Sequence, residues 1–164
     1  MDANTKKNVK NVIRETKEYF EEGKNRNIKF RLEQLAKLKK AIQDNEKGII
    51  KALNIDLHKS ELEAYTTEIG YLYDSIGYFS KNLKKWAKVK RVNTPIMHFG
   101  SKSYIYPEPY GTVLIMGSFN YPFQLVIEPL IGAIAAGNCT IIKPSEFTPS
   151  VSRVMKKMIE EHFD

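Results

Sequence analysis

The sequence predicts an α/β fold in which an N-terminal helical segment precedes the first βαβα half of a doubly wound sheet. Through about the first 90 residues, apolar positions recur every three or four residues, the period of an amphipathic helix. Farther on, two short apolar runs alternate with helical stretches. The charge balance changes as well: residues 1–102 carry 22 Lys and Arg against 13 Asp and Glu, a net +9, whereas residues 103–164 carry 4 against 6, a net −2.

Two helices are predicted before residue 54. The first runs from Thr5 to Phe20 and stops near Gly23, because glycine tolerates the left-handed backbone that ends many helices. The second runs from Asn27 to Leu53, with a gap in its apolar spacing near Asp44. Both are amphipathic, so each should bury one face.

A third helix is predicted to continue without a break to Trp86. Ser60 precedes it as an N-cap, and Glu61 and Glu63 in the first turn complement the positive end of the helix dipole. Its apolar positions step by three and four, and we expect most of them to pack in a core. They are Tyr65, Ile69, Leu72, Ile76, Phe79, Leu83 and Trp86.

The pattern changes after Arg91, where prolines and glycines interrupt short runs. An extended segment of edge-strand character is predicted from Ser103 to Tyr106. Beyond it, "YGTVLIMG" (110–117) has the length and continuous apolar character of a strand covered on both faces of a parallel sheet, and "CTIIKP" (139–144) is predicted as a second short apolar strand.

Each of these two apolar strands leads into a predicted helix. The first helix, within 122–138, contains Pro129, which should kink or restart it, and it closes at Gly137. The second opens with Thr148 as N-cap and Pro149 at the first helical position. The resulting division is an N-terminal helical region (1–90), an extended bridging segment (91–109) and a partial α/β domain (110–164). Two parallel strands make only the beginning of a sheet, so the chain is expected to be part of something longer or to associate with copies of itself.

The totals exclude several classes of protein. No run is long enough for a membrane span, and residues 1–20 have no secretory apolar core, so a cytoplasmic location is expected. The single Cys139 and the three histidines (His58, His98 and His162) lack metal-ligand spacing, and no metal is expected. The basic run Lys81–Arg91 is better explained as the solvated face of a helix than as a nucleic-acid site.

Candidate ligand residues lie in the loops that follow the two apolar strands, because ligands of open α/β sheets collect at the carboxyl ends of strands. Gly117–Tyr121 carries the polar Asn120 between aromatic residues. Lys143–Phe147 carries Lys143 and Glu146, which could donate to and accept from the vicinal hydroxyls of a ribose. Neither strand is followed by the G-x-G-x-x-G turn of the common dinucleotide fingerprint, so spacing alone leaves a nucleotide site open.

The run "EPYGTVLIMGSFNYPFQLVIEPLIGAIAAGNCTIIKPSEFTP" (108–149) closely resembles the nucleotide-binding segment of the aldehyde dehydrogenase superfamily. Upstream, "ALNIDLHKSELEAYTTEIGYL" (52–72) is similar to the class 3 and fatty-aldehyde branch. The resemblance covers nearly the whole chain, but only the first third or so of such an enzyme. It implies a Rossmann-like coenzyme domain within a truncated aldehyde dehydrogenase fold, NAD or NADP as cofactor, and an aldehyde as substrate.

The resemblance also implies roles for individual residues. Asn120 matches the catalytic asparagine, whose amide donates to the oxyanion formed when a cysteine thiolate attacks the aldehyde. Lys143 and Glu146 match the residues that hold the adenosine ribose. Three further residues would line the cofactor cleft: Met116, Gly117 and Phe119. Tyr71 matches a substrate-funnel tyrosine of the class 3 branch, although a core aromatic would be equally at home there.

The chain also departs from the family pattern. Ser118-Phe119 stands where many members have Pro-Trp, so the nicotinamide wall should differ. The nucleophilic cysteine, the glutamate base and the pyrophosphate loop match no part of this chain, and "NCTII" places Cys139 in an apolar strand as a small core residue. The chain alone is therefore expected to be inactive, and a homo-oligomer, a dimer in the parent enzyme, is expected. The alternative is a non-catalytic interaction module that uses the basic 81–91 helix face.

Overall fold

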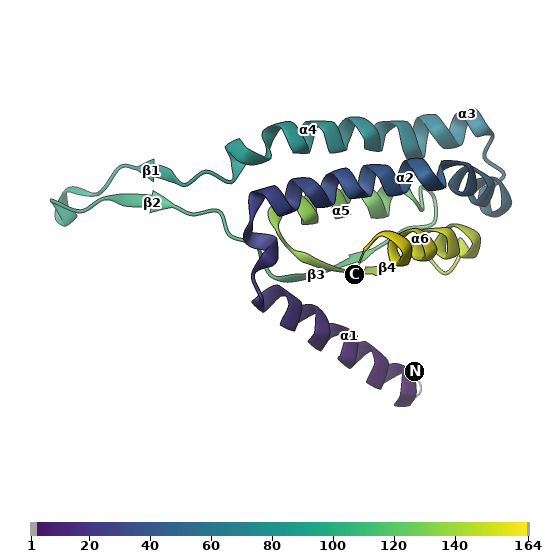
Figure 1. Cartoon of the computed structure of the whole chain (residues 1–164), viewed down its shortest axis with the longest axis horizontal. Helices are drawn as coiled ribbons and strands as arrows, with labels where there is room; N and C mark the ends of the chain where they lie inside the picture. Colours follow the sequence, from purple (N-terminus) through teal and green to yellow (C-terminus); the bar gives the residue numbers. More distant parts are fainter. Residues whose placement is uncertain (1–2, 164) are drawn as a thin grey trace.

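A computed structural model of the chain describes residues 3–163, with side chains from Asn8 onward, so that residues 1, 2 and 164 of the predicted regions lie outside it. Within these residues, helices pack against one small parallel sheet, and a second, antiparallel sheet extends away from them (Figure 1). The α-helices are α1 Ala3–Glu21, α2 Ile28–Leu57, α3 Glu61–Ala64, α4 Gly70–Trp86, α5 Gln124–Ala136 and α6 Pro149–His162. The strands are β1 Lys90–Val92, β2 Ser103–Ile105, β3 Thr112–Met116 and β4 Cys139–Lys143. Short helical turns are η1 Lys24–Arg26, η2 Tyr65–Ile69 and η3 Ile96–His98.

The predicted strand, helix, strand, helix order is present in β3, α5, β4 and α6. Strand β3 pairs with β4 in parallel, from Thr112 opposite Cys139 to Met116 opposite Lys143. Helix α5 makes the crossover between them, as parallel strands require. Because the strands are in register along their full length, the loops that follow them begin side by side.

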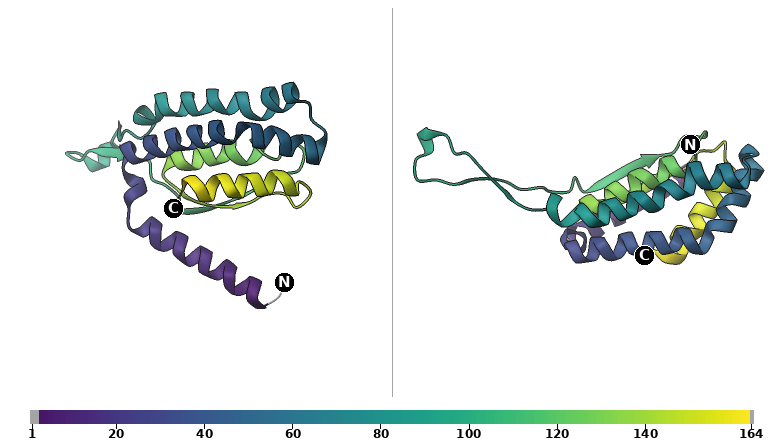
Figure 2. Two further views of the ribbon diagram at one scale, coloured as in Figure 1. Left: turned by 45° about the vertical axis from the view of Figure 1, so that its right-hand side comes forward. Right: turned by 90° about the horizontal axis from the view of Figure 1, so that it is seen from above.

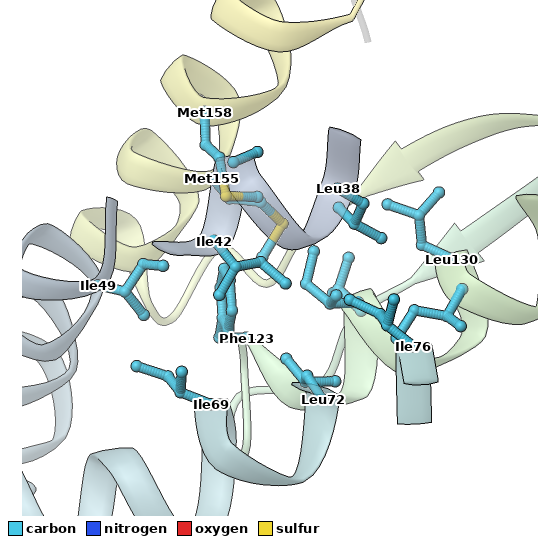
Figure 3. Packing of buried hydrophobic residues seen from close by; sticks show 14 of the residues in the cluster. Leu38, Ile42, Ile49, Ile69, Leu72, Ile76, Phe123, Leu130, Met155 and Met158 are labelled. Carbon is cyan, nitrogen blue, oxygen red and sulfur yellow. The ribbon is translucent and has the colours of Figure 1, made fainter. Parts of the chain in front are cut away.

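A single hydrophobic core joins the N-terminal helices to the α/β part. Helix α2 packs along α6, and α4 packs along α5. Figure 3 shows side chains from these four helical regions converging: Leu38, Ile42, Ile49, Ile69, Leu72, Ile76, Phe123, Leu130, Met155 and Met158. The helical region therefore positions α5 and α6, and with them the loops that precede these helices.

The third predicted helix is not continuous, which corrects the sequence prediction. A π-helical turn at Tyr65–Ile69 (η2) separates α3 from α4. A π-turn inserts an extra residue and shifts the faces on either side of it. Ile69 is buried as predicted and Glu68 is buried beside it, whereas Tyr65, predicted on the same buried face, is exposed.

The prediction that β3 is covered on both faces is wrong for the described residues. Ile115 is buried against the core, but Leu114 is 58% exposed and Met116 is 72% exposed. Alternate residues of a strand point to opposite faces, so one face of β3 near its carboxyl end is open.

An antiparallel hairpin of β1 and β2 projects from the body as an arm (Figures 1 and 2). Strand β2 confirms the predicted edge strand, but β1 was missed because the run Lys81–Arg91 was interpreted as one helix face. Helix α4 ends at Trp86 and β1 begins at Lys90, so this basic run does not form a continuous helical surface.

The helix ends differ from prediction in three places. Helix α2 continues through the gap near Asp44 to Leu57. Helix α5 runs through Pro129 without restarting, and it ends as predicted with Gly137 in the left-handed region (φ 86°). Thr148 is not a side-chain N-cap, although Pro149 does begin α6.

The first backbone N–H groups of α6 instead donate to a side chain of α2. Asp56 Oδ2 accepts from the backbone N–H groups of Ser150 at 2.8 Å and Val151 at 2.9 Å. An acidic side chain therefore caps α6 across 94 residues of sequence, and also complements its dipole.

Over the described part of the chain, no helix combines the length and the apolar character needed to cross a bilayer. Within the same residues, His, Cys, Asp and Glu side chains form no group of three or more that could hold a metal ion.

Candidate active site

Two loops meet at the carboxyl ends of β3 and β4. Gly117 N donates to Lys143 O at 2.9 Å, which carries the strand pairing one residue past Met116. The rings of Phe119 and Phe147, one from each loop, lie edge to face with centroids 6.2 Å apart. The structure therefore brings the predicted residues of both loops to one edge of the sheet.

Asn120 is exposed in the first of these loops. Ser118 Oγ donates to Asn120 Oδ1 at 2.6 Å, which holds the carbonyl end of the amide. Among the described residues, the amide nitrogen of Asn120 has no hydrogen-bond partner. The donor end of the amide is thus available to a ligand with a negatively charged oxygen.

A buried ion pair behind this loop escaped the sequence prediction. Lys59 is 7% exposed and Glu68 is 0% exposed. Lys59 Nζ lies 2.5 Å from Glu68 Oε1 and 3.2 Å from the backbone oxygen of Asn120. One signal was available: Glu68 lies four residues before Leu72, on the face predicted to be apolar. A carboxylate on such a face needs a buried partner.

The second loop carries the predicted pair Lys143 and Glu146, whose charged groups are in direct contact at the surface. The hydrogen bond from Lys143 lowers the pKa of the Glu146 carboxyl below its usual value, with smaller contributions from a backbone hydrogen bond and from the charge of Lys143. An ammonium and a carboxylate held side by side can donate to one hydroxyl and accept from its neighbour.

Gly117 allows the first loop to pack closely on α5. A Cβ at this position would lie 2.4 Å from Val126 Cγ2 and 3.5 Å from Pro144 Cα. No larger residue fits without displacing one of them. Beside it, the exposed face formed by Leu114, Met116, Phe119 and Phe147 is apolar.

Tyr71 lies in the first turn of α4 and is 52% exposed. The interpretation of Tyr71 as a pure core aromatic is therefore wrong. It follows Glu68 by three residues along the helical segment that contacts the Asn120 loop.

Cys139 occupies the first position of β4, at the opposite end of the sheet from the two loops. It is half-buried rather than fully buried, and Asn25 Nδ2 donates to its sulfur at 3.5 Å. Burial raises the pKa of the thiol, which opposes formation of a nucleophilic thiolate. A hollow of about 460 Å³ beside it, between α1, α2 and β4, contains none of the predicted site residues.

The parallel pair of β3 and β4, the crossover helix α5 and the two loops at the carboxyl ends of the strands define an open α/β unit, and comparison with known proteins identifies the family. The family model described as the aldehyde dehydrogenase family matches residues 1–163. The chain belongs to the aldehyde dehydrogenase family, whose members use NAD or NADP.

Relatives cover nearly all of this chain. The 4,4'-diaponeurosporen-aldehyde dehydrogenase of Staphylococcus aureus is 57% identical over 150 residues, which are 92% of this chain and 33% of that protein. Aldehyde dehydrogenase family 3 member A2 of Macaca fascicularis is 41% identical over 152 residues, 93% of this chain and 31% of that protein. The chain thus spans about a third of the length of these relatives, and the predicted class 3 and fatty-aldehyde resemblance is confirmed.

Solved structures confirm the fold. The substrate-bound state of Staphylococcus aureus AldH superposes with a TM-score of 0.92 at 55% identity, covering 95% of this chain and 34% of that one. A betaine aldehyde dehydrogenase of the same species, in complex with NAD+, superposes with a TM-score of 0.76 at 25% identity, covering 90% and 30%. The truncated aldehyde dehydrogenase fold predicted from the sequence is therefore correct.

Proposed function

We propose that this chain forms the N-terminal part of an NAD(P)-dependent aldehyde dehydrogenase that oxidises an aldehyde to a carboxylic acid in the cytoplasm. The observation that carries the proposal is the meeting of Asn120 with the Lys143–Glu146 pair at one edge of a parallel sheet. An oxyanion donor and a ribose-binding pair are both needed for this reaction, and they lie in adjacent loops.

Asn120 would supply one donor of the oxyanion hole. When a thiolate adds to an aldehyde, a sulfur–carbon bond forms and the carbonyl electron pair moves to oxygen. A neutral amide stabilises that developing charge without protonating it. Because Ser118 holds the carbonyl end of the exposed Asn120 amide, the N–H end is left to donate when the substrate arrives.

The described residues fit a dinucleotide cofactor. Lys143 and Glu146 present a donor and an acceptor to a pair of ribose hydroxyls. Met116 and Phe119 supply exposed apolar surface for a flat ring, and Gly117 lets the chain pass close beneath it. When bound, the cofactor accepts a hydride. Tyr71 is exposed on α4 and would line the path by which the aldehyde enters.

Cys139 does not provide the thiolate in this proposal. Cys139 lies opposite Thr112 at the start of the two strands, and Lys143 lies opposite Met116 at their end. The two ends are four residues apart, which at ~3.3 Å per residue puts Cys139 about 13 Å along the sheet from Lys143. The attacking thiolate must come from outside these 164 residues, and the chain alone should form no reduced cofactor with an aldehyde.

Self-association is part of the same proposal. The β1–β2 arm extends from the body, and the turn between its strands exposes three large apolar side chains: Ile96, Met97 and Phe99. An exposed apolar cluster of this kind is typical of a protein interface. Sedimentation velocity of the chain should show a dimer. A variant that combines Ile96→Ser, Met97→Ser and Phe99→Ser should not form this dimer.

A chimaeric enzyme tests the proposed activity. Residues 1–163 would be joined to the remaining sequence of the Staphylococcus aureus relative, and aldehyde-dependent formation of NADH measured. Asn120→Ala should lower kcat about 100-fold or more, the typical cost of removing one oxyanion donor. Lys143→Ala should chiefly raise the KM for NAD.

Asn82→Ala, which removes a half-buried asparagine of α4 that donates to the backbone oxygen of Tyr78, is the control and should leave kcat unchanged. An Asn120→Ala chimaera that keeps the kcat of the parent chimaera would rule out the oxyanion role.

A further inference from the structure

We propose that Lys59 is a positioning residue for Asn120, held in place by Glu68. The inference rests on the proposed function, because positioning matters only if the Asn120 amide meets an oxyanion. It concerns the two buried charged groups behind the loop, which the direct roles of Asn120, Lys143 and Glu146 leave unexplained.

The ammonium of Lys59 reaches the loop at two successive residues. It donates to the backbone oxygen of Asn120 at 3.2 Å, and it lies over the ring of Tyr121, 4.0 Å from the centroid. Its remaining contact is Glu68 Oε1 at 2.5 Å. A compact cation with three donors therefore links a buried carboxylate to the peptide unit that follows the Asn120 side chain.

Glu68 holds the other side of the same loop. Its second oxygen, Oε2, accepts from the N–H groups of Phe123 at 2.9 Å and Gln124 at 3.2 Å. These are among the first amides of α5, which otherwise lacks a side-chain cap. The pair thus fixes the chain at residues 120–121 and again at 123–124, and Asn120 lies at the start of this clamped stretch.

Glu68 lies in a distorted turn of the helical segment. Glu68 and Ile69 are the buried residues of the π-turn Tyr65–Ile69, and α4 then continues from Gly70. A Cβ on Gly70 would lie 3.3 Å from the Tyr65 ring, so glycine eases the turn. π-turns within helices occur frequently at functional sites.

Stability alone is a poor reason for such a pair. Taking two charges out of water carries a large desolvation cost, and apolar replacements of buried pairs are often neutral or stabilising. A directed contact to the loop carbonyl and ring is something that an apolar pair could not supply. Because oxyanion stabilisation depends on donor placement, a displacement of about 1 Å can cost up to 100-fold in rate.

The first test reads the contact directly in the unsubstituted chain. In ¹⁵N-detected spectra of lysine ammonium groups, Lys59 should exchange its protons with water at least about 10-fold more slowly than Lys40, and it should show a cross-peak to the Tyr121 ring. Lys40 is the matched control, because it is ion-paired to Asp44 at the surface. A Lys59 ammonium that exchanges as fast as Lys40 would overturn the proposal.

The second test displaces the loop. In Lys59→Met, the side-chain amide resonances of Asn120 should move toward those of an unstructured asparagine. Arg31→Met removes another buried cation, which donates to the backbone oxygens of Asn25, Arg26 and Ala135 and not to residues 120–124. This control should leave the Asn120 amide resonances in place. Unchanged Asn120 resonances in Lys59→Met would contradict the inference.

The chimaeric enzyme separates positioning from the proposed function itself. Lys59→Met should lower kcat about 10- to 100-fold with little change in the KM for NAD, and Lys59→Arg, which keeps the charge and donors, should recover part of the loss. If Asn120→Ala keeps its kcat, the proposed function fails. If Asn120→Ala loses kcat while Lys59→Met keeps it, only the positioning role fails.

Discussion

The loops after β3 and β4 are built alike at one end and differently at the other. Each leads into a helix whose first backbone N–H groups donate to a carboxylate of the N-terminal helical region. The carboxylate is that of Glu68 for α5 and that of Asp56 for α6. Glu68 is fully buried and paired with Lys59, which also donates to the backbone oxygen of Asn120 in the first loop. In the second loop, the charged pair Lys143 and Glu146 lies at the surface.

The difference separates two demands on a ligand site. An oxyanion donor must be in place before charge develops, so its loop gains from a rigid buried anchor. A ribose contact can adjust as the ligand binds, and two exposed side chains suffice for it. The four predictions below test this contrast between an anchored and an adaptable loop.

The largest effect is expected from Glu68→Gln. This change leaves Lys59 without its charged partner in a buried site, and removing one member of a buried pair typically costs about 3–5 kcal/mol. Urea unfolding followed by circular dichroism would measure the loss. The matched control is Glu146→Gln in the exposed pair, which should leave the unfolding midpoint nearly unchanged; equal losses in both variants would erase the contrast.

Gly117→Ala should have the next largest effect. The added Cβ would meet Val126 in α5, and overpacking of this kind costs about 1–3 kcal/mol. Gly77→Ala is the control, because a Cβ there has no neighbour within 4 Å. It should stabilise α4 by up to about 1 kcal/mol. Thermal unfolding of both variants would show whether the first loop is as tightly packed as its anchor implies.

Asp56→Ala should cost about 1–2 kcal/mol, as the loss of a helix N-cap does. Two amides of α6 would lose their acceptor. By contrast, Thr148→Val should cost nothing, because the Thr148 hydroxyl is buried without a partner among the described residues. A destabilised Thr148→Val would mean that the local residue, and not Asp56, caps this helix.

The smallest effect concerns the exposed pair. Lys143→Ala should raise the pKa of Glu146 toward its usual value, which an NMR titration of the carboxyl carbon would follow. In the unsubstituted chain, the lowered pKa of Glu146 stabilises the folded state at pH values above the pKa that Glu146 has in the unfolded chain. This stabilisation is lost as the pH falls through the pKa of Glu146 in the folded chain. Water screens the pair, so the unfolding midpoint should barely depend on the substitution.

Much of the local structure was predictable. Spacing of apolar residues located the helices, and the glycines at 23 and 137 marked two of their ends. Lys143 and Glu146 were expected together because they lie three residues apart where the second apolar strand ends. These features depend on neighbours in sequence, which periodicity and capping rules describe well.

Features that depend on distant residues were missed or mistaken. The cap of α6 was assigned to Thr148, although Asp56 provides it from 94 residues away. The break in the third helix was missed because a π-turn keeps helical spacing on both sides while shifting the faces. The open face of β3 was missed because an apolar run does not reveal what covers it.

By itself, the sequence determined the order of elements, the edge of the sheet where ligands would bind, and the resemblance to a family. Only the tertiary structure decided which side chains act together at that edge. Lys59 and Glu68 lie nine residues apart, and each lies more than 50 residues from the loop that they hold. Such contacts form only when the helices pack around one core. A buried charge is costly unless it is paired, and the partner is set by the packing of the helices and not by distance along the sequence.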